Sequence, residues 1–309
     1  MKRQAAAIGL GVAVLSSALV LGATQLIERP SVAGWRHATP LAQPRDDHGL
    51  VAIEGKLWVV GGMTGARGDP VASTEIFDPT IGLWTEGAPM PTPRSSAGVA
   101  ALGRMIYVVG GIGVGGAVTG VVEALNTETG RWVRLASLPA PRMQLAAVAA
   151  DGQIWALGGN TGGAPLGTVE RYDPPSDRWT SFAPLPTPRH GLAAALFEGS
   201  IYAVGGQSSF GALRTVEFVA ATGGEWQAGP PLPEALTRLG LATVEGKLHA
   251  MGGASHAVLS AGGARWALAR PMPTSRHGLA AVAVAGRIYT IGGCSDDFND
   301  LGVNQVYSP

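Results

Sequence analysis

The stretch from Arg94 to Trp132 reads RSSAGVAALGRMIYVVGGIGVGGAVTGVVEALNTETGRW. It begins with an arginine, continues through two apolar runs separated by Gly103-Arg104, and reaches the doublet Gly110-Gly111. A glycine-rich segment, a third apolar run and a closing tryptophan follow. The same order of landmarks recurs along most of the chain, and internal repetition of this kind decides the fold before any single element does.

Three markers recur with nearly the same step. The Gly-Gly doublets lie 49, 48, 47, 47 and 40 residues apart and begin at Gly61, Gly110, Gly158, Gly205, Gly252 and Gly292. A tryptophan series runs through Trp35, Trp84, Trp132, Trp179, Trp226 and Trp266. An arginine series runs through Arg45, Arg94, Arg142, Arg189, Arg238 and Arg276. Three independent markers in six registers predict six equivalent structural units.

Each unit contains four short runs typical of β-strands. In the second unit these are 98–102, 105–109, 121–125 and the run around Trp132. The glycine-containing turn between the first two runs indicates a hairpin. Four strands per unit are typical of a propeller blade, with small residues at the narrow centre and aromatic rings in the widening space outside. We therefore predict an all-β protein, a six-bladed β-propeller.

The units resemble the kelch family, whose pattern is a Gly-Gly doublet, a glutamate, a Tyr-Asp-Pro-like segment and a spaced tryptophan. Here Glu75-Ile76-Phe77-Asp78-Pro79 precedes Trp84, and Glu170-Arg171-Tyr172-Asp173-Pro174 precedes Trp179. The resemblance spans about residues 34–309 and implies a kelch propeller. The fifth unit departs from it, because the segment from Gly253 to Trp266 has neither the glutamate nor Tyr-Asp-Pro. The third strand of that blade is therefore left undefined.

The two ends of the repeat complement each other. Trp35 arrives with no Gly-Gly doublet before it, and the run 305–309 ends the chain with no tryptophan after it. We predict that the N-terminal strand completes the sixth blade and closes the ring. Closure of this kind removes the exposed sheet edges that favour aggregation.

Residues 1–23 have the pattern of an export segment, in which Lys2 and Arg3 precede an uncharged run from Ala5 to Ala23. The run fits either a cleaved signal peptide or a retained membrane anchor. Both alternatives place the propeller outside the cytoplasm, in the periplasm or secreted. Residues 24–33 are predicted to be a linker, and residues 34–309 the propeller.

Composition narrows the class of partner. Lys and Arg total 22, as do Asp and Glu, so the formal net charge is zero and no basic run is present. Nucleic acid is therefore not expected as a partner. Cys294 is the single cysteine, which excludes an internal disulfide. We expect a monomer without cofactors, with Cys294 acting as an inert small residue.

The variable segments follow the Gly-Gly doublets, and in a propeller these share one face, here called the loop face, with the links between blades. The six members of the arginine series enter the same face near the central channel. They fit two alternatives: binding a carboxylate or an acidic peptide, or capping the carbonyls of their own blades. The kelch resemblance implies peptide contact for arginines at this position. We therefore take Arg45, Arg94, Arg142, Arg189, Arg238 and Arg276 as ligand-binding candidates.

Three histidines, His48, His190 and His277, lie close behind the arginines and are further ligand-binding candidates. A histidine at a channel mouth can act as an acid, a base or a metal ligand, or can simply be part of the framework. The strand-three glutamates recur with the fold and are interpreted as structural. The acidic segment 296–300 has carboxylate and amide ligands suited to Ca²⁺ but lacks the EF-hand spacing. It is interpreted as a solvated loop, and no metal is predicted.

Two classes of function remain. The first is a module that binds a protein or a carbohydrate through the loop face, because the chain offers no nucleophile, base and orienting group beyond the repeat itself. The alternative is a sugar-acid mutarotase similar to N-acetylneuraminate epimerase, for which the arginines would clamp the carboxylate and a histidine would move protons. A copper oxidase like galactose oxidase is excluded, because all five tyrosines occupy repeat positions.

Overall fold

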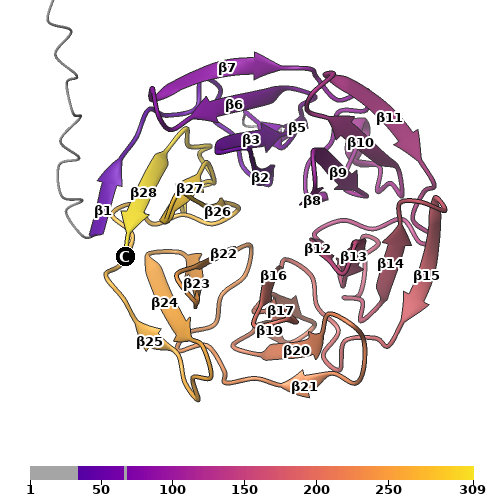
Figure 1. Cartoon of the computed structure of the whole chain (residues 1–309), viewed down its shortest axis with the longest axis vertical. Helices are drawn as coiled ribbons and strands as arrows, with labels where there is room; N and C mark the ends of the chain where they lie inside the picture. The colour runs from indigo at the N-terminus through magenta and orange to yellow at the C-terminus, as the bar shows by residue number, and fades with distance from the viewer. Residues whose placement is uncertain (1–33, 66–67) are drawn as a thin grey trace, which may run out of the picture. The chain divides into compact units, whose positions relative to one another are not determined.

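The computed structural model describes residues 34–65 and 68–309, which form an all-β protein. Six four-stranded antiparallel sheets stand around a central axis like the blades of a propeller (Figure 1). Among these residues one short 3₁₀ turn, Val114–Gly116, interrupts the β-structure. The predicted fold class and blade count are confirmed. The predicted export segment, 1–23, and linker, 24–33, fall outside the described residues.

Each blade is built from consecutive strands, innermost first, except that the last blade borrows its outermost strand from the start of the chain. The first blade contains β2 (Gly49–Ile53), β3 (Lys56–Val60), β6 (Thr74–Asp78) and β7 (Leu83–Gly87). The second contains β8 (Gly98–Leu102), β9 (Met105–Val109), β10 (Val122–Asn126) and β11 (Arg131–Leu135). The third contains β12 (Ala146–Ala150), β13 (Gln153–Leu157), β14 (Val169–Asp173) and β15 (Arg178–Phe182).

The fourth blade contains β16 (Ala193–Phe197), β17 (Ser200–Val204), β20 (Val216–Ala220) and β21 (Gln227–Ala228). The fifth contains β22 (Gly240–Val244), β23 (Lys247–Gly252), β24 (Ser255–Ser260) and β25 (Ala267–Leu268). The sixth contains β26 (Ala280–Val284), β27 (Arg287–Ile291), β28 (Asn304–Ser308) and β1 (Gly34–His37). Two small hairpins, β4 (Met63–Thr64) with β5 (Asp69–Pro70) and β18 (Gln207–Ser208) with β19 (Gly211–Ala212), project from the loops that follow β3 and β17.

The N-terminal strand β1 is the outermost strand of the sixth blade. It pairs antiparallel with β28, from Gly34 opposite Ser308 to His37 opposite Gln305. The Trp35 ring packs against Tyr307 of that strand, with ring centroids 5.1 Å apart. The first and last strands of the propeller therefore lie side by side (Figure 1).

The fifth blade has its third strand despite the missing kelch residues. β24 follows β23 after a two-residue turn, and Gly252 pairs with Ser255 at its start. The other described blades place a longer loop at this point. Blade five therefore keeps the sheet but contributes little to the loop face.

The tryptophan series ties each outer strand to the link from the preceding blade. In all six cases the indole Nε1 donates to a backbone carbonyl oxygen at 2.8–3.0 Å, from Trp84 to Thr39, Trp132 to Ala88, Trp179 to Ala136, Trp226 to Ala183, Trp266 to Pro230 and Trp35 to Arg270. The recurring tryptophans thus both pack between blades and satisfy the link backbone.

Close approach of neighbouring innermost strands explains their small residues. A Cβ added at Gly98 would lie 2.8 Å from the Ala147 Cβ, and one added at Gly49 would lie 2.2 Å from Val99.

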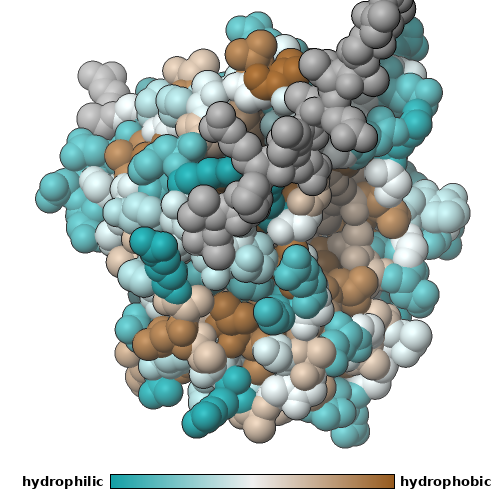
Figure 2. Space-filling view, turned by 60° about the vertical axis from the view of Figure 1, so that its left-hand side comes forward, coloured by the Kyte–Doolittle hydropathy of each residue, from teal (hydrophilic) through white to brown (hydrophobic). Residues whose placement is uncertain are grey.

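Outside this centre, six apolar clusters fill the spaces between blades. In the side view of Figure 2, the hydrophobic groups on the surface form small separate patches within largely hydrophilic surroundings.

Candidate functional site

Five arginines of the series are buried framework groups. Arg45, Arg94, Arg142, Arg189 and Arg276 are each at most 1% exposed. Four of them form an ion pair with the third-strand glutamate of their own blade, as Arg94 does with Glu123 at 2.7 Å and Arg142 with Glu170 at 2.6 Å. The other two pairs join Arg45 to Glu75 and Arg189 to Glu217.

The same guanidinium groups also bond backbone carbonyls. Arg94 Nη1 donates to Gly110 O at 3.0 Å and to Val121 O at 2.6 Å. Arg276 has no acidic partner among the described residues and instead donates to Thr290 and Gln305. Burial lowers the pKa of Arg276 to about 10. These contacts favour the capping alternative over ligand binding for the five arginines.

Arg238 does not belong to this series, so its predicted place among the six recurring arginines is wrong. The equivalent position in blade five is Leu236, whose carbonyl accepts from Gly206 N at 2.8 Å, as the Arg142 carbonyl accepts from Gly111 N at 2.9 Å. Leu236 lies 47 residues after Arg189 and 40 before Arg276, which matches the doublet spacing. Arg238 is two residues further along, and its side chain reaches the channel.

Arg238 is one of six residues that form a closed ring of backbone hydrogen bonds, here called the mouth ring. The N–H of each donates to the carbonyl of the preceding blade at 2.7–2.9 Å, and all six have φ between 48° and 65°. The members are Asp47, Ser96, Gln144, Gly191, Arg238 and Gly278. A cavity of about 100 Å³ lies within this ring. The chain thus narrows to a rigid mouth that presents four polar side chains.

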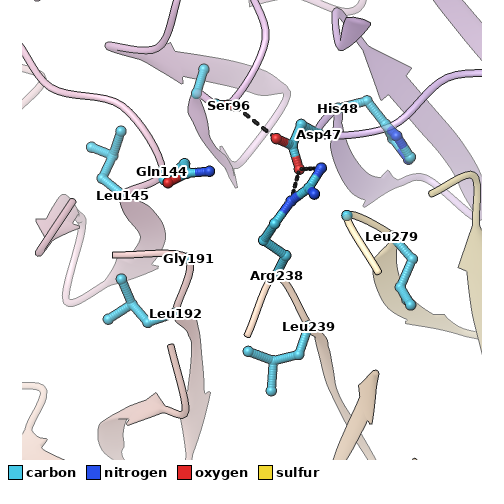
Figure 3. Close-up of a pocket in the computed structure, with 12 residues that line it drawn as sticks. Asp47, His48, Ser96, Gln144, Leu145, Gly191, Leu192, Arg238, Leu239 and Leu279 are labelled. Carbon is cyan, nitrogen blue, oxygen red and sulfur yellow. Dashed lines mark hydrogen bonds and ion pairs between the residues drawn. The ribbon is translucent and has the colours of Figure 1, made fainter. Parts of the chain in front are cut away.

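The mouth ring holds a charged network (Figure 3). Asp47 Oδ1 accepts from Arg238 Nε at 2.9 Å, and Asp47 Oδ2 accepts from Ser96 Oγ at 2.8 Å. Arg238 Nη2 also donates to Asp46 Oδ2 at 2.5 Å. The guanidinium therefore bridges from blade five to blade one across the channel. In the same view the leucines behind the ring point away from it, between the blades.

A larger cavity, here called the loop-face pocket, shares Asp47, Ser96, Gln144 and Arg238 with the mouth ring and has a volume of about 390 Å³. It extends to the loops that follow β3 and β27. Asp300 joins these loops, because its Oδ2 accepts from Gly65 N at 2.6 Å. Pockets for small ligands occupy roughly 300–1,000 Å³. The loop-face pocket is therefore large enough for a small molecule.

Burial perturbs the ionisable groups of this pocket. It raises the pKa of Asp46, and the neighbouring Asp47 carboxylate raises it further. Burial and Asp46 raise the pKa of Cys294 to about 12, so the thiol is neutral. Burial lowers the pKa of Arg238, but Asp47 and Asp46 outweigh that effect and the net direction is upward. Arg238 is therefore a permanent cation and Cys294 is a poor nucleophile.

The three candidate histidines lie in different environments. The His48 ring packs against Gly292 of blade six, and burial together with Arg45 and Arg276 lowers its pKa to about 3. His190 and His277 are half-buried, and burial lowers the pKa of each. His277 alone approaches the loop-face pocket, through an edge contact with Phe298 at 5.6 Å between ring centroids. All three rings are therefore neutral near pH 7.

Several pocket residues were missed from the sequence: Asp46, Asp47, Ser96, Gln144 and Phe298. The mouth ring lies two residues after each framework arginine, but its residues differ from blade to blade and so leave no periodic signal. The register itself was readable, and aligning it with Leu236 would have placed Arg238 with the mouth ring and not with the framework arginines. Within 34–65 and 68–309, no three His, Cys, Asp or Glu side chains are grouped so as to hold a metal ion.

Comparison with known proteins defines the class. The kelch-repeat domain model of KLHDC2, KLHL20 and DRC7 matches residues 24–206, and the chain therefore belongs to the kelch-repeat family. A solved structure described as "Structure of YjhT" is similar, with a TM-score of 0.76 and 16% identity, over 86% of this chain and 95% of that one. At that identity the likeness shows the shared fold. No curated protein matches the chain. Among the described residues, no helix has the length and apolarity to cross a membrane.

Proposed function

We propose that this kelch propeller is a binding module that takes a carbohydrate through its loop-face pocket. The observation that carries the proposal is the convergence of Asp47, Ser96, Gln144 and Arg238 from four blades onto one pocket. Small-molecule sites combine a concave wall with a few fixed polar groups. Charged and amide groups on rigid backbone are well suited to pairing with sugar hydroxyls.

The charge of the site weighs against a sugar acid as the ligand. Five arginines are committed to glutamates, glutamine or backbone within their own blades. The sixth, Arg238, is already held by two carboxylates at 2.5–2.9 Å. A ligand carboxylate would have to displace Asp46 or Asp47 to reach the guanidinium. These contacts favour the binding module over the mutarotase alternative.

A protein partner is the second candidate, supported by exposed apolar side chains at the tips of three loops. Phe210 is 101% exposed, Phe298 74% and Val114 72%. All three follow the second strand of their blade, and so project from the loop face. Exposed aromatic side chains are frequent anchors of protein interfaces. A partner docked there would cover the pocket rather than enter it.

Direct binding measurements on the full chain would test the proposal. We expect at least one neutral or basic sugar from a monosaccharide and oligosaccharide panel to raise the melting temperature, because a ligand of the native state stabilises it. Phe298→Ala should weaken that shift. Ile81→Ala, which removes a side chain 64% exposed in the tight β6–β7 turn on the opposite face, should leave it unchanged. Equal effects of the two variants, or no shift with any sugar, would contradict carbohydrate binding at this pocket.

The proposal includes export, in keeping with the pattern of residues 1–23. We expect a monomeric propeller in the periplasm or secreted, or anchored by residues 5–23. Mass spectrometry of the protein from each cell fraction would decide between a cleaved and a retained segment. Recovery of the intact chain from the cytoplasm alone would overturn this part.

A further inference from the structure

We infer that the ligand of the loop-face pocket carries a protonated amine, so that an amino sugar with a free ammonium group is the class of carbohydrate it takes. This inference rests on the proposed function and adds the charge of the ligand to it. Three features of the pocket support it: an unsatisfied carboxylate oxygen, an excess of carboxylates, and apolar walls beside polar ones.

The first feature is Asp46. Its side chain is 7% exposed and lines the pocket, with Oδ2 bonded to Arg238. Its other oxygen, Oδ1, accepts no hydrogen bond from an N–H or O–H group of the described residues. The one donor nearby among them is the Cys294 thiol, whose hydrogen bond lowers the pKa of Asp46. Its Sγ also lies 3.6 Å from the His277 carbonyl oxygen, and it has a single weak proton for the two acceptors. A buried carboxylate oxygen calls for a donor, and an ammonium group supplies three.

The second feature is the balance of charge. Asp46, Asp47 and Asp300 line the pocket, and among its described lining residues Arg238 is the single cation. Burial and Asp47 both disfavour ionised Asp46, and a cation beside Oδ1 would relieve both effects. These carboxylates are not grouped so as to hold a metal ion.

The third feature is the wall that faces these groups. Met63, Ile112 and Met143 give the pocket apolar surface, and Phe298 stands exposed at its edge. A pyranose ring has an apolar face that can pack on such side chains, while Gln144 and Ser96 offer partners for its hydroxyls. A bare alkyl amine would leave those polar partners unused. The combination therefore favours an amino sugar over a simple amine.

A matched set of ligands tests the inference. Calorimetry of the full chain near neutral pH would compare glucosamine, glucose, N-acetylglucosamine and cadaverine. We expect glucosamine to bind about tenfold or more tightly than glucose, because a charge-assisted hydrogen bond is stronger than a neutral one. N-acetylglucosamine, which has lost the charge, should bind no better than glucose.

The outcomes separate the two proposals. Equal affinity for glucose and glucosamine would overturn the amine inference and leave carbohydrate binding intact. Absence of binding by all three sugars would overturn both. Binding of cadaverine without glucosamine would keep recognition of an amine but overturn the assignment to a sugar.

A matched pair of variants locates the effect. Asp46→Asn keeps an acceptor for Arg238 and removes the charge, so the preference for glucosamine over glucose should fall to about threefold or less. Asp151→Asn makes the same change in the β12–β13 turn, where φ is 49°, and should leave the preference unchanged. An unchanged preference in folded Asp46→Asn would place the ammonium elsewhere. The comparison of ligands on the unmodified chain stands even if that variant fails to fold.

Discussion

At the scale of single residues, His48 occupies a position that the repeat gives to leucine in blades three to six and to Ala97 in blade two. Leu145, Leu192 and Leu239 pack against the doublets Gly110, Gly158 and Gly205 of their preceding blades, as His48 packs against Gly292. Both ring nitrogens of His48 lack a hydrogen-bond partner among the described residues. A buried polar group without partners destabilises a fold. The imidazole is therefore a local weakness in the seam between blades six and one.

We predict that His48→Leu raises the melting temperature by about 2–6 °C, since an unsatisfied buried group costs roughly 1–3 kcal/mol. The folded-state pKa of His48 is about 3, below the usual value of 6.5, so unfolding takes up a proton between these values. His48→Leu should therefore help most on the acid side. Scanning calorimetry at several pH values checks this, with exposed His37→Leu as the control. A melting temperature that falls at every pH would show that His48 makes a contact the fold needs.

At the scale of the element, blade five shows that a blade can form without the buried ion pair. It has Leu236 in place of the framework arginine, and Ala257 of β24 stands where blades one to four have the glutamate and blade six has Gln305. Both side chains belong to one apolar cluster. Buried ion pairs are often replaceable by apolar groups, whereas losing one partner leaves a buried charge. The ion pair of blades one to four is thus one workable solution, and the apolar pair of blade five is another. In blade six, the bonds from Arg276 to Gln305 and Thr290 are a third.

The single variants Arg142→Leu and Glu170→Ala should each destabilise the protein by about 3–5 kcal/mol, because each leaves one buried charge unpaired. The double variant copies blade five, and we expect it to recover about half of that loss or more. Urea denaturation of the three variants measures the coupling. Additive losses in the double variant would mean that the pair does not act as a unit.

Blade five also marks what the sequence could and could not predict. Glycine doublets, tryptophans and arginines recur, because every blade needs the same turn, the same bond to its link and the same cap. Their period predicted the blade count and most strands. The mouth ring has no shared side chain, since its repeated feature is a backbone conformation with positive φ. Asp47 and Gln144 were therefore invisible to a search for repeats, although their register was not. Arg238 was found, but it was placed in the arginine series in the position that belongs to Leu236.

At the scale of the whole molecule, the ring is closed beside a pair of buried histidines. His249 Nδ1 lies 2.8 Å from His256 Nε2, and His256 Nδ1 lies 3.1 Å from Arg270 O. The carbonyl can only accept, so His256 carries its proton on Nδ1 and accepts from His249 through Nε2. The His256 ring meets Trp35 of β1 and Tyr307 of β28 edge-on. The strand pair that closes the propeller thus rests on two neutral imidazoles.

Acid should open the molecule at this seam first. Burial, then His256 and Lys247, lower the pKa of His249 to about 3, and burial lowers that of His256. Folded His249 thus binds fewer protons than the unfolded chain between pH 6.5 and 3, so its contribution to stability is complete above pH 6.5 and declines toward pH 3.

Hydrogen exchange on lowering the pH should accelerate in residues 34–37 before residues 178–182, the outer strand of blade three. The double variant His249→Tyr, His256→Val introduces residue types that other blades use at these positions. It should remove the difference in exchange between residues 34–37 and residues 178–182. Simultaneous exchange of both strands in the unmodified protein would show that the seam is not the weakest point.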